Sequence, residues 1–379
     1  MAALLTCGDI VNYQRKDGML CSAELADIVS SADLSICNFE APIEGYGSPQ
    51  PKSGIHHFQR EATINGLKKQ GFDLLLLANN HIMDFGQEGL AATIEAAKKV
   101  GMETLGAGMN PDSAYKPMIK ELGDVTIGMI NACEAQFGVI DYFKRKSAAG
   151  YAWINHPRID ELLSRLKQKC DFVVLFAHAG LEHYNIPQKV WRERYRHFCR
   201  SGASVVIGSH PHVPQGYEKY RDSLIFYSLG NFYFDSKNYK DKEDCSFAVW
   251  LDLIRGKLPE FKPVFHYKKS GLIHSAPNHK KVDIEKICAL LEDGYEKAHD
   301  QMCLEAFTQF RRNLVYSLMP IHYDGNLKSS VRGIVSRILG RRNKVDKTLL
   351  QLHLLRNETL HFVAKHAMEI IAEDRFCES

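Results

Sequence analysis

Short apolar runs alternate with helix-like segments over roughly the first 270 residues of the chain. Continuous apolar runs such as residues 172–177 and 205–207 are typical of buried strands, whereas residues 61–70 carry apolar side chains at helical spacing and are followed by Gly71. We expect an α/β fold, a layered β-sheet sandwich flanked by helices. The expected helices span residues 24–31, 61–70, 89–100, 158–169 and 190–200, and the expected strands span residues 2–7, 34–37, 74–78, 171–177 and 203–207.

The pattern changes near residue 245. Apolar and polar residues alternate from Phe247 to Leu253, which predicts antiparallel strands that close the sheet. Residues 270–279 are rich in Ser, Gly, Pro and His and are predicted to be a linker. Apolar residues at three- and four-residue spacing follow to the end. The sequence therefore predicts one domain over residues 1–275 and a helical C-terminal extension over residues 280–379.

Composition and charge exclude several classes of protein. A chain of 379 residues that is 45% hydrophobic can form a large core and an appendage. The formal net charge of +3 gives no electrostatic reason to expect nucleic acid as a partner. The 10 cysteines are scattered without a C-x-x-C pair, which favours free thiols in a reducing compartment. With no signal peptide and no apolar stretch of about 18 residues, we expect a cytoplasmic protein.

Side chains of the kinds that bind metals follow several of the predicted strands. Because ligands gather beyond the carboxyl ends of strands in open α/β sheets, these side chains would converge on one edge. His210 and His212 are separated only by Pro211, so their rings can point to one side. A lone His-x-His is a weak signal, since histidines are often ordinary surface residues. Here it occurs with further candidate ligands at equivalent places in the pattern, and together they predict a metal site: Asp9, Glu40, Asn80 and His178.

Three more residues are candidates for catalysis or for contact with a substrate. His81 follows Asn80 and could act as a general acid, oriented by Asp84. A polar turn is the alternative interpretation, because Asn and Asp are common in turns. Asn231 lies at a strand end beside the predicted edge and is expected to contact the site. His57 is interpreted as a loop or edge residue.

Six motifs follow one another between residue 1 and about residue 240: Gly8-Asp9, Asn38-Phe39-Glu40, Leu77-Ala78-Asn79-Asn80-His81 with Asp84-x-Gly86, His178-x-Gly180-x-Glu182, Gly208-x-His210-Pro211-His212-Val213 and Tyr227-Ser228-Leu229-Gly230-Asn231-Phe232. Together they resemble the CapA family of bacterial capsule and poly-γ-glutamate synthesis proteins. The fold of that family is similar to that of calcineurin-like metallophosphoesterases.

The resemblance implies roles for the candidate residues. Glu182 lies where the family motif keeps a glutamate, which implies substrate binding or support of a ligand. The phosphoesterase pattern has a histidine where this chain has Val11, so one metal would have fewer protein ligands. Mixed nitrogen and oxygen ligands fit one or two ions of Mn, Zn or Fe. The implied assignment is Asp9 and His212 for one metal, Glu40 as the bridge, Asn80, His178 and His210 for the other metal, and His81 as proton donor.

Two functions are compatible with these residues. The first is a metal-dependent hydrolase of capsule or exopolymer metabolism, in which a metal-activated hydroxide attacks a phosphoester, amide or isopeptide bond of a substrate such as poly-γ-glutamate. The second is a non-catalytic accessory subunit with a degenerate metal site, which binds the anionic polymer or a capsule synthesis protein. Val11 favours the second function, and the intact set of histidines favours the first.

The stretch from Lys328 to Arg356 is strongly basic, with Asp346 as its only acidic residue. A basic amphipathic helix can lie on an anionic membrane surface, here the inner face, or bind a polyanion. A solvated face of an ordinary helical appendage is the alternative, because charge runs usually have that role.

Overall fold

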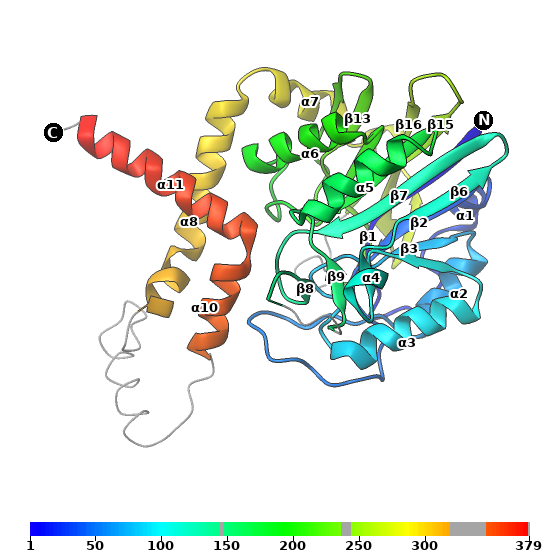
Figure 1. The fold of residues 1–379 in the computed structure, drawn as a ribbon, viewed down its shortest axis with the longest axis horizontal. Coiled ribbons are helices and arrows are strands. Elements are labelled where there is room, and N and C mark those ends of the chain that lie inside the picture. Colours follow the sequence, from blue (N-terminus) through cyan, green and yellow to red (C-terminus); the bar gives the residue numbers. More distant parts are fainter. Residues whose placement is uncertain (144–147, 236–243, 319–345, 378–379) are drawn as a thin grey trace. The chain divides into compact units, whose positions relative to one another are not determined.

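Two β-sheets pack against each other in the larger of the two units of this computed structural model (Figure 1). The larger unit comprises residues 1–50 and 56–294, and the smaller unit comprises residues 51–55 and 295–379. The structure describes residues 1–143, 148–235, 244–318 and 346–377.

The first sheet has the strand order β17-β16-β15-β1-β2-β3-β4, with β14 also paired to β1. Strands β1 to β4 and β14 run parallel, whereas β15, β16 and β17 are antiparallel, as the alternating pattern after residue 245 predicts. The strands are β1 (Ala2–Val11), β2 (Leu34–Phe39), β3 (Leu74–Leu76), β4 (Glu103–Leu105), β14 (Asn231–Phe234), β15 (Cys245–Leu253), β16 (Glu260–Lys269) and β17 (Leu272–Ser275).

The second sheet has the order β12-β13-β11-β10-β7-β6, and its strands β7, β10, β11 and β13 run parallel. A small third sheet has the order β5-β9-β8. The strands are β5 (Ala107–Gly108), β6 (Met118–Leu122), β7 (Val125–Cys133), β8 (Val139–Ile140), β9 (Gly150–Ala152), β10 (Phe172–His178), β11 (Val205–Ser209), β12 (Tyr217–Tyr220) and β13 (Ser223–Phe226).

The core lies between the two large sheets and under the helices outside them. Leu4, Ile36 and Leu74 of the first sheet share one buried cluster with Val174 and Phe226 of the second. Such continuous burial explains why these strands read as unbroken apolar runs. The predicted layered sandwich flanked by helices is therefore confirmed. Its helices are α1 (Ala23–Ser30), α2 (Ala62–Lys69) and α3 (Gly86–Lys99) on the first sheet, α5 (Pro157–Lys167) and α6 (Lys189–Ser201) on the second, and the short α4 (Pro111–Ala114).

The linker predicted over residues 270–279 is wrong in part, because residues 272–275 form strand β17. Lys269 pairs with Leu272, so Ser270 and Gly271 form a two-residue hairpin turn with φ values of 51° and 74°. Positive φ at both positions is the geometry of a type I′ turn, in which glycine is favoured. The Ser-Gly pair that suggested a linker is therefore the turn of a hairpin.

The predicted helical C-terminal extension is confirmed by α8 (Tyr295–Leu318), α10 (Lys347–Arg356) and α11 (Glu358–Cys377). In the basic stretch, residues 328–345 lie outside the described residues. Helix α7 (Ile284–Glu292) belongs to the larger unit, where Arg192 Nη2 donates to the Leu291 carbonyl at 2.9 Å. The domain boundary at residues 275–280 stays a prediction. Among the described residues, no helix combines the length and apolarity needed to cross a bilayer.

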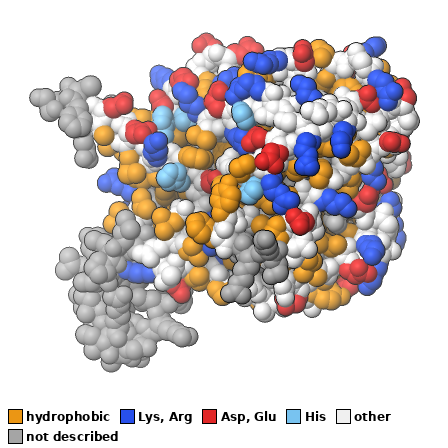
Figure 2. Space-filling view, in the orientation of Figure 1, with side chains coloured by type: hydrophobic (Ala, Val, Ile, Leu, Met, Phe, Trp, Pro, Cys, Tyr) orange, Lys and Arg blue, Asp and Glu red, His pale blue; other side chains and the backbone are white. Residues whose placement is uncertain are grey.

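Charged side chains of both signs are mixed on the face that Figure 2 shows. On the face of the larger unit in Figure 2, the Lys and Arg side chains in blue alternate with Asp and Glu side chains in red. Several of the arginines are paired with carboxylates, as in the contact of Arg194 with Asp160 at 3.0 Å. This mixture agrees with the nearly balanced formal charge of +3.

Candidate metal centre

The carboxyl ends of parallel strands from both large sheets meet at the candidate site. In the first sheet, Asp9 of β1 is level with Asn38 of β2 and Asn231 of β14. In the second sheet, His178 at the end of β10 is level with Cys133 and Ser209. The residues that directly follow those strand ends are Glu40, Glu134 and His210.

A close approach of two backbone segments sets the position of Asp9. The pairing of β1 with β2 is interrupted at Gly8, where the register shifts. A Cβ atom at Gly8 would lie 1.8 Å from the carbonyl oxygen of Gly230, so only glycine fits there. The Asp9 backbone N–H donates to that carbonyl at 3.2 Å. The contact places Asp9 next to Asn231, which follows Gly230.

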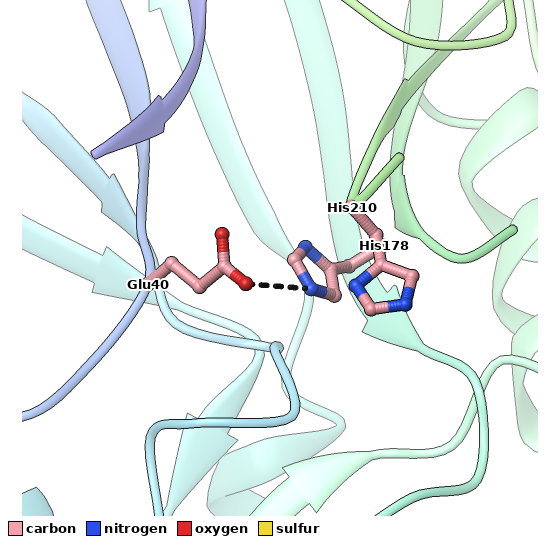
Figure 3. Close-up of side chains that lie close together, drawn as sticks. All are labelled: Glu40, His178 and His210. Carbon is pink, nitrogen blue, oxygen red and sulfur yellow. Dashed lines mark ion pairs between the residues drawn. The ribbon is translucent and has the colours of Figure 1, made fainter. Parts of the chain in front are cut away.

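Glu40 faces two histidines that the second sheet supplies. Its Oε1 lies 3.6 Å from His178 Nε2, and the rings of His178 and His210 lie side by side with centroids 4.7 Å apart (Figure 3). Asn80 Oδ1 lies 3.1 Å from the same His178 Nε2. The side chains of Glu40, His178 and His210 are at most 2% exposed. These four residues therefore form one compact group of potential metal ligands.

A second group of potential ligands shares Glu40 with the first. Its other members are Asp9, whose Oδ2 lies 3.4 Å from His212 Nδ1, and His212, whose Nε2 lies 3.8 Å from Glu40 Oε1. Asp9 and Glu40 are fully buried and His212 is nearly so. The two groups meet at Glu40, which is the arrangement that a carboxylate between two cations would have.

The Glu40 carboxylate gives a direct test of whether a cation fits. Both of its oxygens are buried, and neither has a hydrogen-bond partner among the described residues. A buried carboxylate that accepts no hydrogen bond is costly, so native structures nearly always give it a partner. The imidazole nitrogens of His178 at 3.6 Å and of His212 at 3.8 Å are too far from the carboxylate for hydrogen bonds, but each could share an ion with it through bonds of about 2.0–2.2 Å. The residues present therefore fit a divalent cation.

The ionisation of His178 and His210 also suits metal binding. Burial lowers the pKa of His210 to about 4, and burial with the neighbouring imidazoles places the pKa of His178 well below its usual value. Both rings are therefore neutral near pH 7, and a neutral ring keeps a lone pair for a metal. Burial, followed by the charge of Asp9, raises the pKa of the Glu40 carboxyl well above its usual range. A cation would offset both effects on Glu40.

The backbone at the site is held in an uncommon conformation. His210 has a φ of 97° and His212 has a φ of 59°, both in the left-handed region. Side chains other than glycine rarely adopt this region, and such residues cluster at functional sites. His210 is further fixed by its backbone N–H, which donates to Asp9 Oδ2 at 3.1 Å. This uncommon backbone conformation directs the two imidazole rings toward the carboxylates.

His81 and Asp84 are brought together at the rim of the site. His81 Nδ1 lies 2.7 Å from Asp84 Oδ2, while the His81 side chain remains 14% exposed. The same Asp84 oxygen accepts from the backbone N–H of His57 at 2.7 Å, and the rings of His57 and His81 are 4.3 Å apart. His57, interpreted from the sequence as a loop or edge residue, therefore packs on the candidate acid. Burial lowers the pKa of His57 to about 4.

The two residues predicted to bind substrate have different surroundings. Glu182 has a half-exposed side chain whose Oε1 lies 3.9 Å from His210 Nε2, so it is open to a ligand. Asn231 is 1% exposed, and its amide contacts His212 Nδ1 at 2.9 Å and Asp244 Oδ2 at 2.9 Å. These contacts would orient His212. Substrate binding by either residue stays a prediction.

The structure adds residues that the sequence reasoning did not select. Glu134 Oε1 lies 3.5 Å from His210 Nε2, and Gln136 joins Glu134 to Asn80 through its amide. Asn38 Nδ2 donates to Asp9 Oδ1 at 2.7 Å and lies 3.1 Å from His178 Nδ1. Glu134 carried a usable signal, because it directly follows an apolar run, as the selected ligands do. Gln136 carried none.

Comparison with known proteins supplies a family. A family model described as "Bacterial capsule synthesis protein PGA_cap" matches residues 4–236. The chain is 30% identical over 234 residues to the "Capsule biosynthesis protein CapA" of Bacillus anthracis, covering 60% of this chain and 56% of that protein. It is also 30% identical over 210 residues to the "PGA biosynthesis protein CapA" of Bacillus subtilis (strain 168), covering 55% of each. The chain spans about half the length of these relatives.

Two further matches are more distant. A "probable polyglutamine synthesis accessory protein" of Mycobacterium tuberculosis is 24% identical over 213 residues, 53% of this chain and 56% of that protein. Among solved structures, a putative 5'-nucleotidase from Staphylococcus aureus matches with a TM-score of 0.45 and 12% identity, covering 77% of this chain and 58% of that chain. Likeness at this level assigns no activity.

Proposed function

Because this chain belongs to the family of bacterial capsule synthesis proteins (PGA_cap), we propose that it is a metal-dependent hydrolase of capsule or exopolymer metabolism. The proposed substrate is an anionic polymer of the poly-γ-glutamate type. The observation that carries the proposal is the buried Glu40 carboxylate, which has no hydrogen-bond partner among the described residues and is flanked by His178 and His212. Burying this carboxylate without a partner would cost free energy, and a bound cation would offset that cost.

The candidate ligands would form two metal-binding groups. Glu40, His178, His210 and Asn80 would hold one divalent ion, and Asp9, Glu40 and His212 would hold a second. Manganese, zinc and iron all suit this set of nitrogen and oxygen ligands. When bound, the ions would supply Lewis acidity and lower the pKa of water.

The residues around the ligands would orient them and move a proton. Ser209 Oγ lies 3.1 Å from His178 Nδ1, so it can accept a hydrogen bond from the Nδ1–H group and leave Nε2 for the metal. His81, whose Nδ1 is held by Asp84, would present Nε2 at the rim and give a proton to the leaving group. Glu182 would contact the polymer at the half-exposed edge.

A non-catalytic accessory role is the second candidate, and one observation favours it. Val11 stands where the phosphoesterase pattern has a histidine, and it is fully buried in β1 next to Phe234 of β14. It cannot ligate a metal, so Asp9, Glu40 and His212 are the three protein ligands available to the second ion within the described residues. In this role the protein would bind the polymer or a capsule synthesis protein and would not cleave it. Contact of the basic C-terminal stretch with a membrane stays a prediction.

Metal content and cleavage of a defined polymer test the two roles together. Protein purified without chelator should contain at least one equivalent of transition metal and should shorten poly-γ-glutamate, measured by size-exclusion chromatography. His178→Ala should lower both metal content and cleavage, because it removes an imidazole ligand. His279→Ala is the matched control, since His279 is exposed and lies outside the site. A full complement of metal with no cleavage of polyglutamate, phosphodiester or isopeptide substrates would favour the accessory role.

A further inference from the structure

A second group of potential ligands lies in the smaller unit, away from the family's motifs. Helices α8 and α11 cross within this unit (Figure 1). They bring together His299 and Asp300 of α8 and His366 of α11. Asp300 Oδ1 lies 2.6 Å from His366 Nε2 and 3.9 Å from His299 Nδ1. The two imidazole rings are 4.9 Å apart.

A simple ion pair between Asp300 and His366 does not account for this group. An exposed pair of that kind contributes roughly 0–1 kcal/mol and needs no third residue. Here His299 is only 5% exposed in its side chain, yet its Nδ1 is turned to the half-exposed Asp300. Two protonated imidazoles at this separation would repel each other, whereas two neutral ones can share a cation. The three side chains therefore offer three potential ligand atoms to one ion.

The positions of the two ring nitrogens of His299 determine which neighbouring side chains can bind the same metal ion. Nδ1 lies near Asp300, and Nε2 lies 3.7 Å from Cys303 Sγ, one helical turn further along α8. Since the two nitrogens sit on different edges of the ring, an ion held by Nδ1 is out of reach of Cys303. The thiol would instead contact the second ring nitrogen and fix the ring orientation, the usual role of a group behind a metal-binding histidine.

We propose that His299 Nδ1, an Asp300 carboxylate oxygen and His366 Nε2 form a zinc site that joins α8 to α11. Two imidazoles and a carboxylate are ligands typical of zinc, with bonds of about 2.0–2.2 Å, so two ligand atoms of one ion lie at most roughly 4 Å apart. The separation of 3.9 Å between His299 and Asp300 meets this limit, whereas the hydrogen bond of 2.6 Å between Asp300 and His366 would lengthen by roughly 1 Å to admit the ion. Asp300 and His366 are 44% and 33% exposed, so water can complete a tetrahedral set.

The site would clamp the helical unit. Helix α8 ends at Leu318 and α11 begins at Glu358, so the chain between the two ligand-bearing helices is long. A metal that binds only the folded arrangement stabilises it in proportion to the logarithm of its concentration. This inference does not depend on the hydrolase proposal, because none of the three residues belongs to the centre at Glu40.

The test compares zinc content and thermal unfolding of the full chain. Wild type and variants are equilibrated with zinc, passed through gel filtration, and analysed for bound zinc by mass spectrometry. His366→Gln should lower bound zinc by one equivalent. His361→Gln on the same helix is the matched control, because His361 is exposed and outside the group, and it should lose none. Cys303→Ser should also retain the ion.

The following results would contradict the proposed zinc site. Equal zinc content in wild type and His366→Gln would overturn it, as would the same loss in His361→Gln. Loss of zinc in Cys303→Ser would overturn the ligand set. Far-ultraviolet circular dichroism checks that the variants keep their helices. If His366→Gln unfolds, the decision comes from protein carrying Glu40→Gln, which removes the ligand that both ions of the first centre share. Zinc must raise, and chelator must lower, the midpoint of its helical signal, and no shift would overturn the proposal.

Discussion

Replacing Glu40 by glutamine should have opposite effects on stability with and without metal. In the metal-free protein the substitution replaces a carboxyl group whose pKa is raised well above its usual range by burial, and whose two oxygens have no hydrogen-bond partner among the described residues. An amide of the same shape is cheaper to bury than a carboxylate, and the difference is on the order of 1–2 kcal/mol. We therefore expect Glu40→Gln to stabilise the metal-free protein by about that amount.

With metal present the sign should reverse. A cation at 100 times its dissociation constant stabilises the wild type by about 2.7 kcal/mol, because it binds only the folded state. The glutamine side chain is a weaker ligand and lacks the negative charge that both proposed ions share. The metal-dependent gain should then be mostly lost, which leaves the variant less stable than the wild type by about 1 kcal/mol or more.

The assay is thermal unfolding of both proteins in chelator and in excess manganese or zinc. A change of 1 kcal/mol corresponds to a shift of roughly 2–4 °C for a unit of this size. Glu95→Gln serves as the control, since Glu95 is exposed on α3 and should respond to neither condition. A variant that is less stable than wild type in chelator as well would show that Glu40 has a structural role, and an equal metal-dependent rise in both proteins would show that it is no ligand.

Three further predictions follow from the structure. His81→Ala should keep the bound metal, measured by mass spectrometry, and lower kcat of polymer cleavage, because the proposed role of His81 is proton transfer; loss of metal would refute that role. His266 is buried, and burial lowers its pKa to about 3, so it must gain a proton on unfolding below about pH 6.5. As the pH is lowered to 5, the free energy of unfolding of the wild type should decrease by about 2 kcal/mol relative to that of His266→Phe, measured by urea unfolding in chelator. If the difference in stability between the two proteins were the same at pH 7.5 and pH 5, this prediction would be contradicted. A fragment of residues 1–294 should unfold at a higher temperature than one of residues 1–275, since Leu291 of α7 is buried in the larger unit, and equal midpoints would show that α7 adds nothing.

The positions of the ligands could be predicted because each lies at or just beyond the carboxyl end of a buried strand. Asp9, Glu40 and His178 lie at carboxyl ends of parallel strands, and the sandwich brings those ends together. Apolar runs and the residue after them are local features of a sequence, so they are visible without a structure. The layered architecture was predictable for the same reason.

Other features depend on contacts between distant segments. His57 packs on His81 only because the loop around it folds back over Asp84. Gln136, which follows β7, contacts His210 beyond β11 of the same sheet and also Asn80, which follows β3 of the first sheet. Strand β17 was missed because its turn, Ser270-Gly271, has the composition of a linker. In each case the deciding information is which segments meet, and no local pattern contains it.

The origin of the ligands in both sheets has a consequence for the order of folding. Glu40 and His178 come from different sheets and are 138 positions apart in the chain, so their contact forms only after the sheets have docked. Contacts between such distant residues are slow to form because the intervening loop must first be closed. A metal at this centre would therefore bind after the folding barrier has been crossed. It would slow unfolding and extend the lifetime of the native state, while leaving the folding rate nearly unchanged.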